Sequence, residues 1–104
     1  TNGVNSQSSI STHYDSSKAA QIMMMKGLAE EFAHSVRING IAPGWVNTKM
    51  NATLPPEEME KETAKIWLER FAEPHEIAGF IAYVCGNGGS YMTGQNIMID
   101  GGYR

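Results

Sequence analysis

Two short apolar runs constrain the fold of this chain more than any other feature: VRINGIA at residues 36–42 and QNIMI at residues 95–99. A turn signal follows each run, Pro43-Gly44 after the first and Asp100-Gly101-Gly102 after the second. We therefore predict that both runs are strands. The sequence between them is long and has the composition of helices. Strands separated by helices form a parallel sheet with helical crossovers, which predicts an α/β fold.

Three helices are predicted around these strands, at residues 14–34, 57–70 and 74–86. The first is apolar over more than one stripe, so we expect it to pack on the sheet and also on something else, such as a partner subunit. The second opens with an acidic turn and the third with a proline, as is typical of helix N-termini. The predicted order is helix, strand, helix, helix, strand, with loops at residues 1–13 and 45–56.

The length of the chain and the number of its strands do not match a complete α/β domain. A chain of 104 residues suffices for one small domain. Two parallel strands form a poor sheet on their own, because parallel strands need neighbours and cover on both faces. The sequence also begins with Thr1 and not with Met. We therefore expect residues 1–104 to be the C-terminal part of a single larger domain whose N-terminal part lies upstream.

Charge and cysteine content exclude several classes of function. The chain has 8 basic and 11 acidic residues, so it lacks the basic patch of a nucleic-acid or membrane-surface partner. No apolar run approaches the roughly 20 residues of a membrane helix. The single cysteine, Cys85, excludes an internal disulfide, fits the cytoplasm and is expected to be a small core residue. His13, His34 and His75 lack zinc-ligand spacing, so no metal site is predicted.

Tyr14 and Lys18, in the stretch YDSSK, form the candidate reactive pair. On a helix they lie on one face, one turn apart. An isolated phenol keeps its proton up to a pH of about 10, and a nearby ammonium favours the phenolate. Such a pair suits proton transfer to a carbonyl or from an alcohol, and the lysine can also donate to a ribose hydroxyl. The same spacing arises by chance, so two ordinary side chains on one helix face are the alternative.

Three motifs in order place the pair in a wider pattern: YDSSKAA at residues 14–20, VRINGIAPGWVNTKM at residues 36–50 and GQNIMIDGGYR at residues 94–104. Together they resemble the C-terminal half of the short-chain dehydrogenase/reductase family, over essentially the whole chain. The resemblance implies a Rossmann-type doubly wound parallel sheet that binds NAD or NADP. It also implies hydride transfer between the nicotinamide and a small carbonyl or alcohol substrate. The segments look most like 3-oxoacyl-[acyl-carrier-protein] reductases, but sugar, polyol and other alcohol dehydrogenases share them closely.

The resemblance assigns a role to each matching residue. Tyr14 is implied to be the catalytic acid/base, and Lys18 its partner, which also binds the nicotinamide ribose. The turn at residues 43–44 is implied to begin a loop bordering the nicotinamide, with the backbone around Val46 and the hydroxyl of Thr48 at the carboxamide. Without the resemblance, this turn is an ordinary end to a strand. The implied cofactor-binding residues are Tyr14, Lys18, Pro43, Gly44, Trp45, Val46 and Thr48.

Other parts of the family's site do not match residues in this chain. The family's serine lies 13 residues before the tyrosine, which corresponds here to Thr1 or to a residue just upstream. The Gly-rich dinucleotide turn, the catalytic asparagine and the residues that choose between NAD and NADP belong upstream. The sequence GNGGS at residues 86–90 follows a helix and not a strand, which is the wrong context for phosphate binding. We therefore expect activity only with the first half of the domain present.

Residues 50–70 and the first helix bear on substrate and assembly. Met50, Leu54, Met59, Ile66 and Trp67 form either an apolar lid or one face of an ordinary amphipathic helix. A lid would favour an acyl or otherwise lipophilic substrate. In the family, the first helix and the last strand commonly form subunit contacts, which implies a homo-oligomer, a dimer or tetramer. The alternative function is that of a non-catalytic fragment or degenerate relative that serves packing or oligomerisation.

Overall fold

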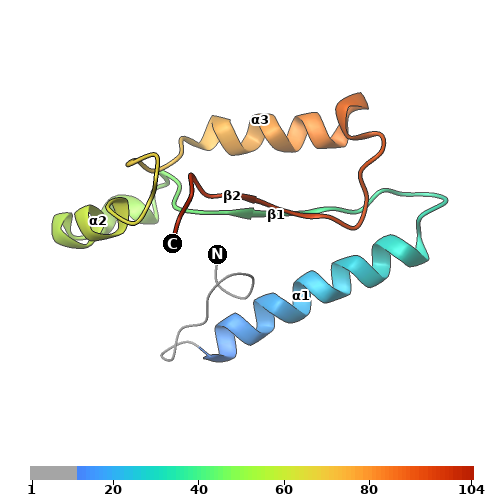
Figure 1. The fold of residues 1–104 in the computed structure, drawn as a ribbon, viewed down its shortest axis with the longest axis horizontal. Helices are drawn as coiled ribbons and strands as arrows, with labels where there is room; N and C mark the ends of the chain where they lie inside the picture. Colours follow the sequence, from blue (N-terminus) through green and yellow to red (C-terminus); the bar gives the residue numbers. More distant parts are fainter. Residues whose placement is uncertain (1–11) are drawn as a thin grey trace.

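The computed structural model describes residues 12–104. Within this range the elements follow the predicted order of helix, strand, helix, helix and strand (Figure 1). They are α1 (Thr12–Glu31), β1 (Gly40–Pro43), η1 (Asn51–Thr53), α2 (Pro56–Thr63), α3 (Pro74–Cys85), η2 (Asn87–Gly89) and β2 (Asn96–Ile99), where η denotes a 3-10 helix. The α/β fold class predicted from the sequence is confirmed.

The two strands form a parallel pair at the centre of the structure. Gly40 lies opposite Asn96 and Pro43 lies opposite Ile99, and both α2 and α3 belong to the crossover between the strands. Figure 1 shows α3 on one side of this pair and α1 on the other. Helices on both faces of a parallel sheet are the arrangement of doubly wound α/β proteins.

Two elements are shorter than the sequence predicts by three residues or more. The second helix ends at Thr63 and not near residue 70, because Ile66 leaves the helix and forms an antiparallel bridge with Tyr103. Glu69 then has a φ of 57°, which a right-handed helix cannot contain. The first strand begins at Gly40 and not at residue 36, since the chain before it is bonded to the loop that precedes β2.

Arg37 anchors the chain before β1 to the end of α3. Its guanidinium donates hydrogen bonds to the backbone carbonyls of Val84 at 2.9 Å, Met92 at 3.2 Å and Gly89. A cation at a helix C-terminus satisfies carbonyls that have no partner inside the helix and interacts favourably with the helix dipole. This contact therefore fixes α3 against the start of the sheet.

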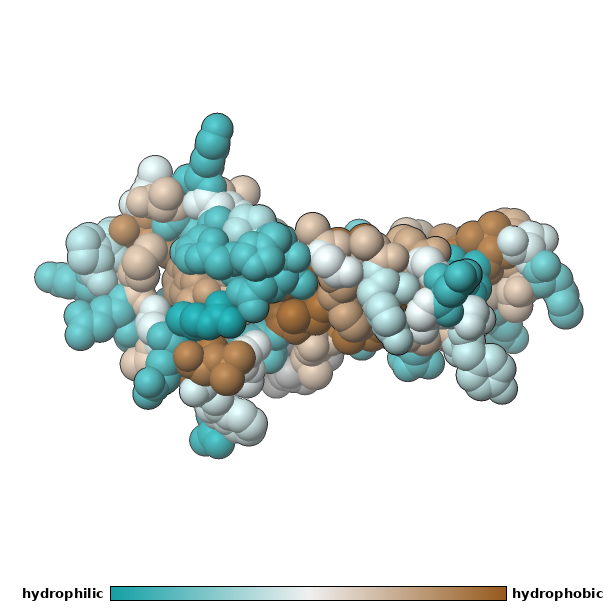
Figure 2. Space-filling model, turned by 90° about the horizontal axis from the view of Figure 1, so that it is seen from above, coloured by the Kyte–Doolittle hydropathy of each residue, from teal (hydrophilic) through white to brown (hydrophobic). Residues whose placement is uncertain are grey.

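The described residues bury a small core and expose many large apolar side chains. The buried hydrophobic residues are Ala29, Ile66, Phe71 and Val84. Figure 2 looks onto the side that carries α3 and shows apolar surface between polar groups.

Cys85 is exposed, so the prediction of a core cysteine is wrong. Successive helical residues point about 100° apart, so the burial of Val84 turns Cys85 outward. No helix in residues 12–104 is long and apolar enough to cross a membrane.

Candidate active site

Tyr14 and Lys18 lie on the first turns of α1, as the sequence predicts. The Lys18 Nζ atom is 5.5 Å from the centroid of the Tyr14 ring, which is within the range of a cation–π interaction. Half of the tyrosine's surface is exposed. Both side chains line the same cavity, so the pair is accessible to a molecule bound there.

This cavity has a volume of about 520 Å³ and is formed by segments far apart in the sequence. Its lining residues are Tyr14, Lys18, Gln21 and Ile22 from α1, Ile41, Ala42, Pro43, Gly44 and Trp45 from β1 and the turn after it, and Asn51, Glu62, Asn96 and Tyr103. The cavity includes the C-terminal end of β1, the end of a parallel strand at which α/β proteins bind ligands. The structure thus brings Tyr14 and Lys18 together with residues 43–45. Val46 and Thr48 are not among the lining residues.

The turn after β1 passes very close to the chain that leaves β2. The Gly44 amide donates a hydrogen bond to the Ile99 carbonyl at 2.9 Å. A Cβ atom added at Gly44 would lie 2.8 Å from both Cα and Cβ of Asp100, closer than such atoms approach. This neighbouring segment alone therefore requires glycine at position 44, whatever the cavity binds.

The segment after this turn is held by the chain that enters α3. Val46 and Ala72 form a parallel bridge, in which the Ala72 amide donates to the Trp45 carbonyl at 2.9 Å and the Asn47 amide donates to the Ala72 carbonyl at 2.8 Å. The Trp45 ring also stacks on Phe71, with centroids 5.3 Å apart and an interplanar angle of 16°. Residues 45–47, predicted as part of an irregular loop, are therefore held by backbone bonds and by a stacked aromatic pair.

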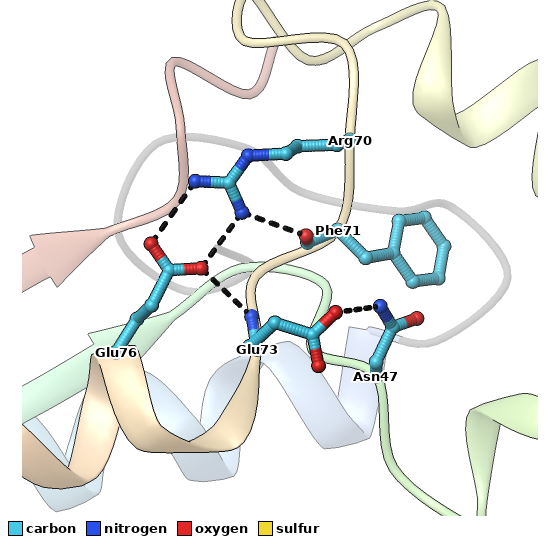
Figure 3. A network of polar contacts seen from close by, with 5 residues as sticks. All are labelled: Asn47, Arg70, Phe71, Glu73 and Glu76. Carbon is cyan, nitrogen blue, oxygen red and sulfur yellow. Dashed lines mark hydrogen bonds and ion pairs between the residues drawn. The ribbon is translucent and has the colours of Figure 1, made fainter.

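A polar network extends this attachment to the first turn of α3 (Figure 3). Asn47 Nδ2 donates to Glu73 Oε1 at 2.8 Å, and the Glu73 amide donates to Glu76 Oε1 at 2.9 Å. Arg70 binds the same Glu76 carboxylate with both terminal nitrogens, at 2.7 and 3.0 Å, and also donates to the Phe71 carbonyl. The hydrogen bond from Arg70, followed by that from the Glu73 amide, lowers the pKa of Glu76 to about 2.

Glu62 is the centre of a second cluster, in the wall of the cavity. Its Oε2 atom accepts hydrogen bonds from the Tyr103 hydroxyl at 2.6 Å and from Trp45 Nε1 at 3.3 Å, and its Oε1 atom is 3.2 Å from Lys65 Nζ. Burial alone would raise the pKa of Glu62, but the hydrogen bonds from Tyr103, Lys65 and Trp45 lower it overall. Burial, together with the bond to Glu62, raises the pKa of Tyr103. Sequence reasoning missed Glu62 and Tyr103, which no spacing pattern links.

Several other candidates lie apart from the cavity. The five residues considered as a lid do not line it: Ile66 is buried in the core, whereas Met50 is 83% exposed and Trp67 packs under Arg104.

A Cβ atom added at Gly88 or Gly89 would collide with α3, so these glycines serve packing. In residues 12–104, no three His, Cys, Asp or Glu side chains are grouped to hold a metal ion. Thr1, the candidate counterpart of the family's serine, lies outside the described residues.

The sequence matches a family whose members include carrier-protein reductases. The family model described as enoyl-(acyl carrier protein) reductase matches residues 3–104. The chain is 42% identical over 92 residues to the 3-oxoacyl-[acyl-carrier-protein] reductase FabG of Thermotoga maritima, covering 88% of this chain and 37% of that protein. It is 38% identical over 95 residues to acetoacetyl-CoA reductase of Synechocystis, covering 89% of this chain and 40% of that protein. The chain thus spans less than half the length of the curated relatives it matches.

Solved structures match the fold as well as the sequence. A short-chain dehydrogenase/reductase described as glucose/ribitol dehydrogenase from Brucella melitensis superimposes with a TM-score of 0.82 at 34% identity, over 91% of this chain and 39% of that one. A 3-oxoacyl-[acyl-carrier protein] reductase from Brucella melitensis gives a TM-score of 0.83 at 33% identity, over 88% and 34%. The arrangement of α1, β1, α3 and β2 therefore matches one part of each of these larger chains.

Proposed function

Because this chain belongs to the short-chain dehydrogenase/reductase family, we propose that its cavity serves hydride transfer between the nicotinamide of NAD or NADP and a carbonyl or alcohol carbon. The observation that carries this proposal is the meeting of Tyr14 and Lys18 with residues 43–45 in one cavity. A proton-transfer pair at the C-terminal end of a parallel strand lies where this class of fold binds its ligands.

The described residues fit the nicotinamide end of such a cofactor. Lys18 offers an ammonium donor for a ribose hydroxyl, and the turn at residues 43–44 forms part of the cavity wall beside it. Residues 45–48 follow that turn, and the bridge to Ala72 and the bond from Asn47 to Glu73 hold them in place. We propose that the backbone around Val46 and the hydroxyl of Thr48 meet the carboxamide. The bound cofactor would supply or accept the hydride.

Tyr14 is proposed to hold the proton that the reaction needs. In the direction of reduction its hydroxyl donates this proton to the carbonyl oxygen of the substrate, and in oxidation its phenolate accepts one from the alcohol. Lys18 Nζ lies 5.5 Å from the ring centroid, so its positive charge is close to the group that is proposed to transfer the proton. Such a pair separates two roles, since one side chain moves the proton and the other stabilises the charge that remains.

The substrate and the assembly of the protein are proposed from its relatives and its surface. A 3-oxoacyl thioester is the proposed substrate, because FabG of Thermotoga maritima and acetoacetyl-CoA reductase of Synechocystis are named for reducing such compounds. We also propose that the protein is cytoplasmic and forms a homo-oligomer. Each subunit is proposed to contain the N-terminal half of the domain as well. The support for these proposals is the exposed apolar face of α1, where Met23 and Met24 are 68% and 62% exposed, and the single cysteine.

The experiment that tests the function is a Tyr14→Phe substitution in the full-length protein. Oxidation of NADH and of NADPH is followed with acetoacetyl-CoA as substrate. We expect kcat to fall by about 10²–10⁴-fold, which is the usual contribution of general acid–base catalysis. Tyr83→Phe, on α3 and outside the cavity lining, is the matched control. Full activity of Tyr14→Phe, or no turnover by the unmodified protein, would contradict the proposal and favour a non-catalytic role.

A further inference from the structure

Resting on the proposed function, we propose that Glu62 is a specificity-determining residue. It makes the cavity select substrates that are uncharged beside the reacting carbonyl and reject free carboxylates. The substrate class is therefore the thioesters, esters and neutral ketones, and excludes the oxo acids from which they derive. Glu62 comes from α2, so it lies in the cavity wall without belonging to the Tyr14–Lys18 pair or to the turn at residues 43–44.

The hydrogen bonds of Glu62 hold its charge on the cavity side. Tyr103 and Trp45, which both bind Oε2, line the cavity themselves. Lys65, which binds Oε1, does not line it. The Tyr103 bond is 2.6 Å long, the length of a strong bond from a hydroxyl to an ionised carboxylate. Two donors in the wall thus keep one carboxylate oxygen at the cavity, while the counter-charge of Lys65 lies outside it.

Glu62 is ionised at neutral pH. The hydrogen bonds from Tyr103, Lys65 and Trp45 outweigh the effect of burial and lower the pKa of this carboxyl. The carboxylate is only partly exposed, with 21% of its side-chain surface accessible. Water therefore screens its charge less completely than that of a fully exposed glutamate.

The only other formal charge among the described lining residues is that of Lys18. Lys18 lies beside Tyr14, and the proposed function gives its ammonium to the ribose of the cofactor. A substrate that reaches Tyr14 from the side of Glu62 would then meet this carboxylate, whose counter-charge on Lys65 lies outside the cavity lining. A carboxylate on that substrate would be repelled, whereas a thioester or ester of the same size would not.

A pair of substrates that differ in charge and by one methyl group tests this inference. The full-length protein is assayed with methyl acetoacetate and acetoacetate, each with NADH and NADPH. We expect the unmodified protein to prefer the ester. Glu62→Gln, which keeps the size of the side chain and one acceptor oxygen, should reduce the ester-to-acid ratio of kcat/KM by about tenfold. Glu60→Gln, an exposed position on the same helix, should leave the ratio unchanged. An unchanged ratio in Glu62→Gln would overturn the proposal.

A second variant tests the same charge from the opposite direction without altering Glu62. Lys65→Gln removes the counter-charge on the outer carboxylate oxygen, so the ester-to-acid ratio should rise by about two- to threefold. A fall in the ratio, or no change, would count against the inference even if Glu62→Gln failed to fold.

Measuring the binding of the ester and of the acid distinguishes a failure of this inference from a failure of the proposed function. If the unmodified protein reduces neither of these compounds nor acetoacetyl-CoA, the proposed function fails, and ligand-detected NMR then measures binding of methyl acetoacetate and acetoacetate. Preferential binding of the ester, lost in Glu62→Gln, would still support the role of Glu62. Equal binding of both compounds, or binding of neither, would overturn it.

Discussion

The two walls of the cavity are held in place in different ways. The helix wall consists of α1 with Tyr14 and Lys18, and this helix exposes large apolar side chains such as Met24 to the exterior of the described structure. The loop wall consists of residues 43–45 with Glu62 and Tyr103. Backbone bridges, a stacked ring pair and two polar clusters, one of them formed by the adjoining Asn47, fix it. The proposed chemistry therefore lies on the wall with more uncovered apolar surface, and the shape of the cavity is set mainly by the other.

This contrast shows what each wall depends on. The loop wall is stabilised by contacts within residues 40–104, so substitutions there should act on stability as well as on the cavity. The helix wall needs a surface to cover its apolar side chains, because large exposed apolar areas in proteins mark contact sites. Substitutions on it should therefore act on activity or assembly more than on the stability of the described part.

The largest effect on stability is expected from removal of the aromatic support of the loop wall. Phe71 is buried and stacks on Trp45, so Phe71→Ala should lower the free energy of unfolding by about 3–5 kcal/mol. Urea unfolding followed by circular dichroism measures this change. Met50→Ala, at a side chain 83% exposed in the same loop region, is the control and should change it by less than about 0.5 kcal/mol. Equal effects of the two substitutions would mean that the loop wall is not anchored through Phe71.

A pair of glycines compares the two walls directly. Gly44→Ala places a methyl group 2.8 Å from Asp100, which should destabilise the protein by about 1–3 kcal/mol. Gly27→Ala in α1 meets no atom within 4 Å and should stabilise the helix by about 0.5–1 kcal/mol. Thermal unfolding of the full-length protein distinguishes them. Destabilisation by Gly27→Ala would sharpen the contrast, because it would show that another surface packs closely on α1 at that point.

Glu69, in the segment between Glu62 and Phe71, offers a smaller, stabilising change close to the loop wall. Its φ of 57° is unfavourable for a residue with a Cβ atom, so Glu69→Gly should stabilise the protein by about 1 kcal/mol. Glu69→Ala keeps the Cβ atom and serves as the control, with little change expected. The midpoints of thermal unfolding compare the two variants. A lower midpoint for Glu69→Gly than for Glu69→Ala would contradict the prediction.

The smallest effect is expected from the exposed ion pair at the start of α3. The pKa of Glu76 falls from 4.5 to about 2 in the folded state, mainly through its hydrogen bond to Arg70. Because the folded pKa is depressed, the stabilisation is fully present above pH 4.5 and disappears as the pH falls toward 2. The difference in unfolding midpoint between the unmodified protein and Glu76→Gln should be largest above pH 4.5 and should vanish as the pH falls toward 2. A difference that stays constant from pH 6 to pH 2 would exclude the ion pair as its cause.

Local patterns allowed much of the fold to be predicted from the sequence. Helix α1 is a long run of good helix formers, α3 begins with a proline, and the two strands are short apolar runs ended by turns. The extent of α2 could not be predicted in this way. It ends where Ile66 bridges Tyr103, and a contact between residues so distant in the sequence leaves no mark in the sequence around either of them.

The same distinction separates the residues of the candidate site. Tyr14 and Lys18 could be identified because a helix places them one turn apart, and residues 43–45 because they follow a strand. The bond between Glu62 and Tyr103 joins residues 41 positions apart, and that between Asn47 and Glu73 joins residues 26 positions apart. Such pairs follow no periodicity, so only the folded chain brings them together.

The parallel pairing of β1 and β2 also has a kinetic consequence. The two strands cannot join through a tight turn, so the whole crossover with α2 and α3 must be folded back before Gly40 meets Asn96. Closing a long loop costs entropy before any strand contact compensates for it, and topologies rich in such contacts fold slowly. We therefore expect the helices to form early from local interactions and the junction of Gly44 with Ile99 to form late. The cavity is expected to be complete only after this junction has formed.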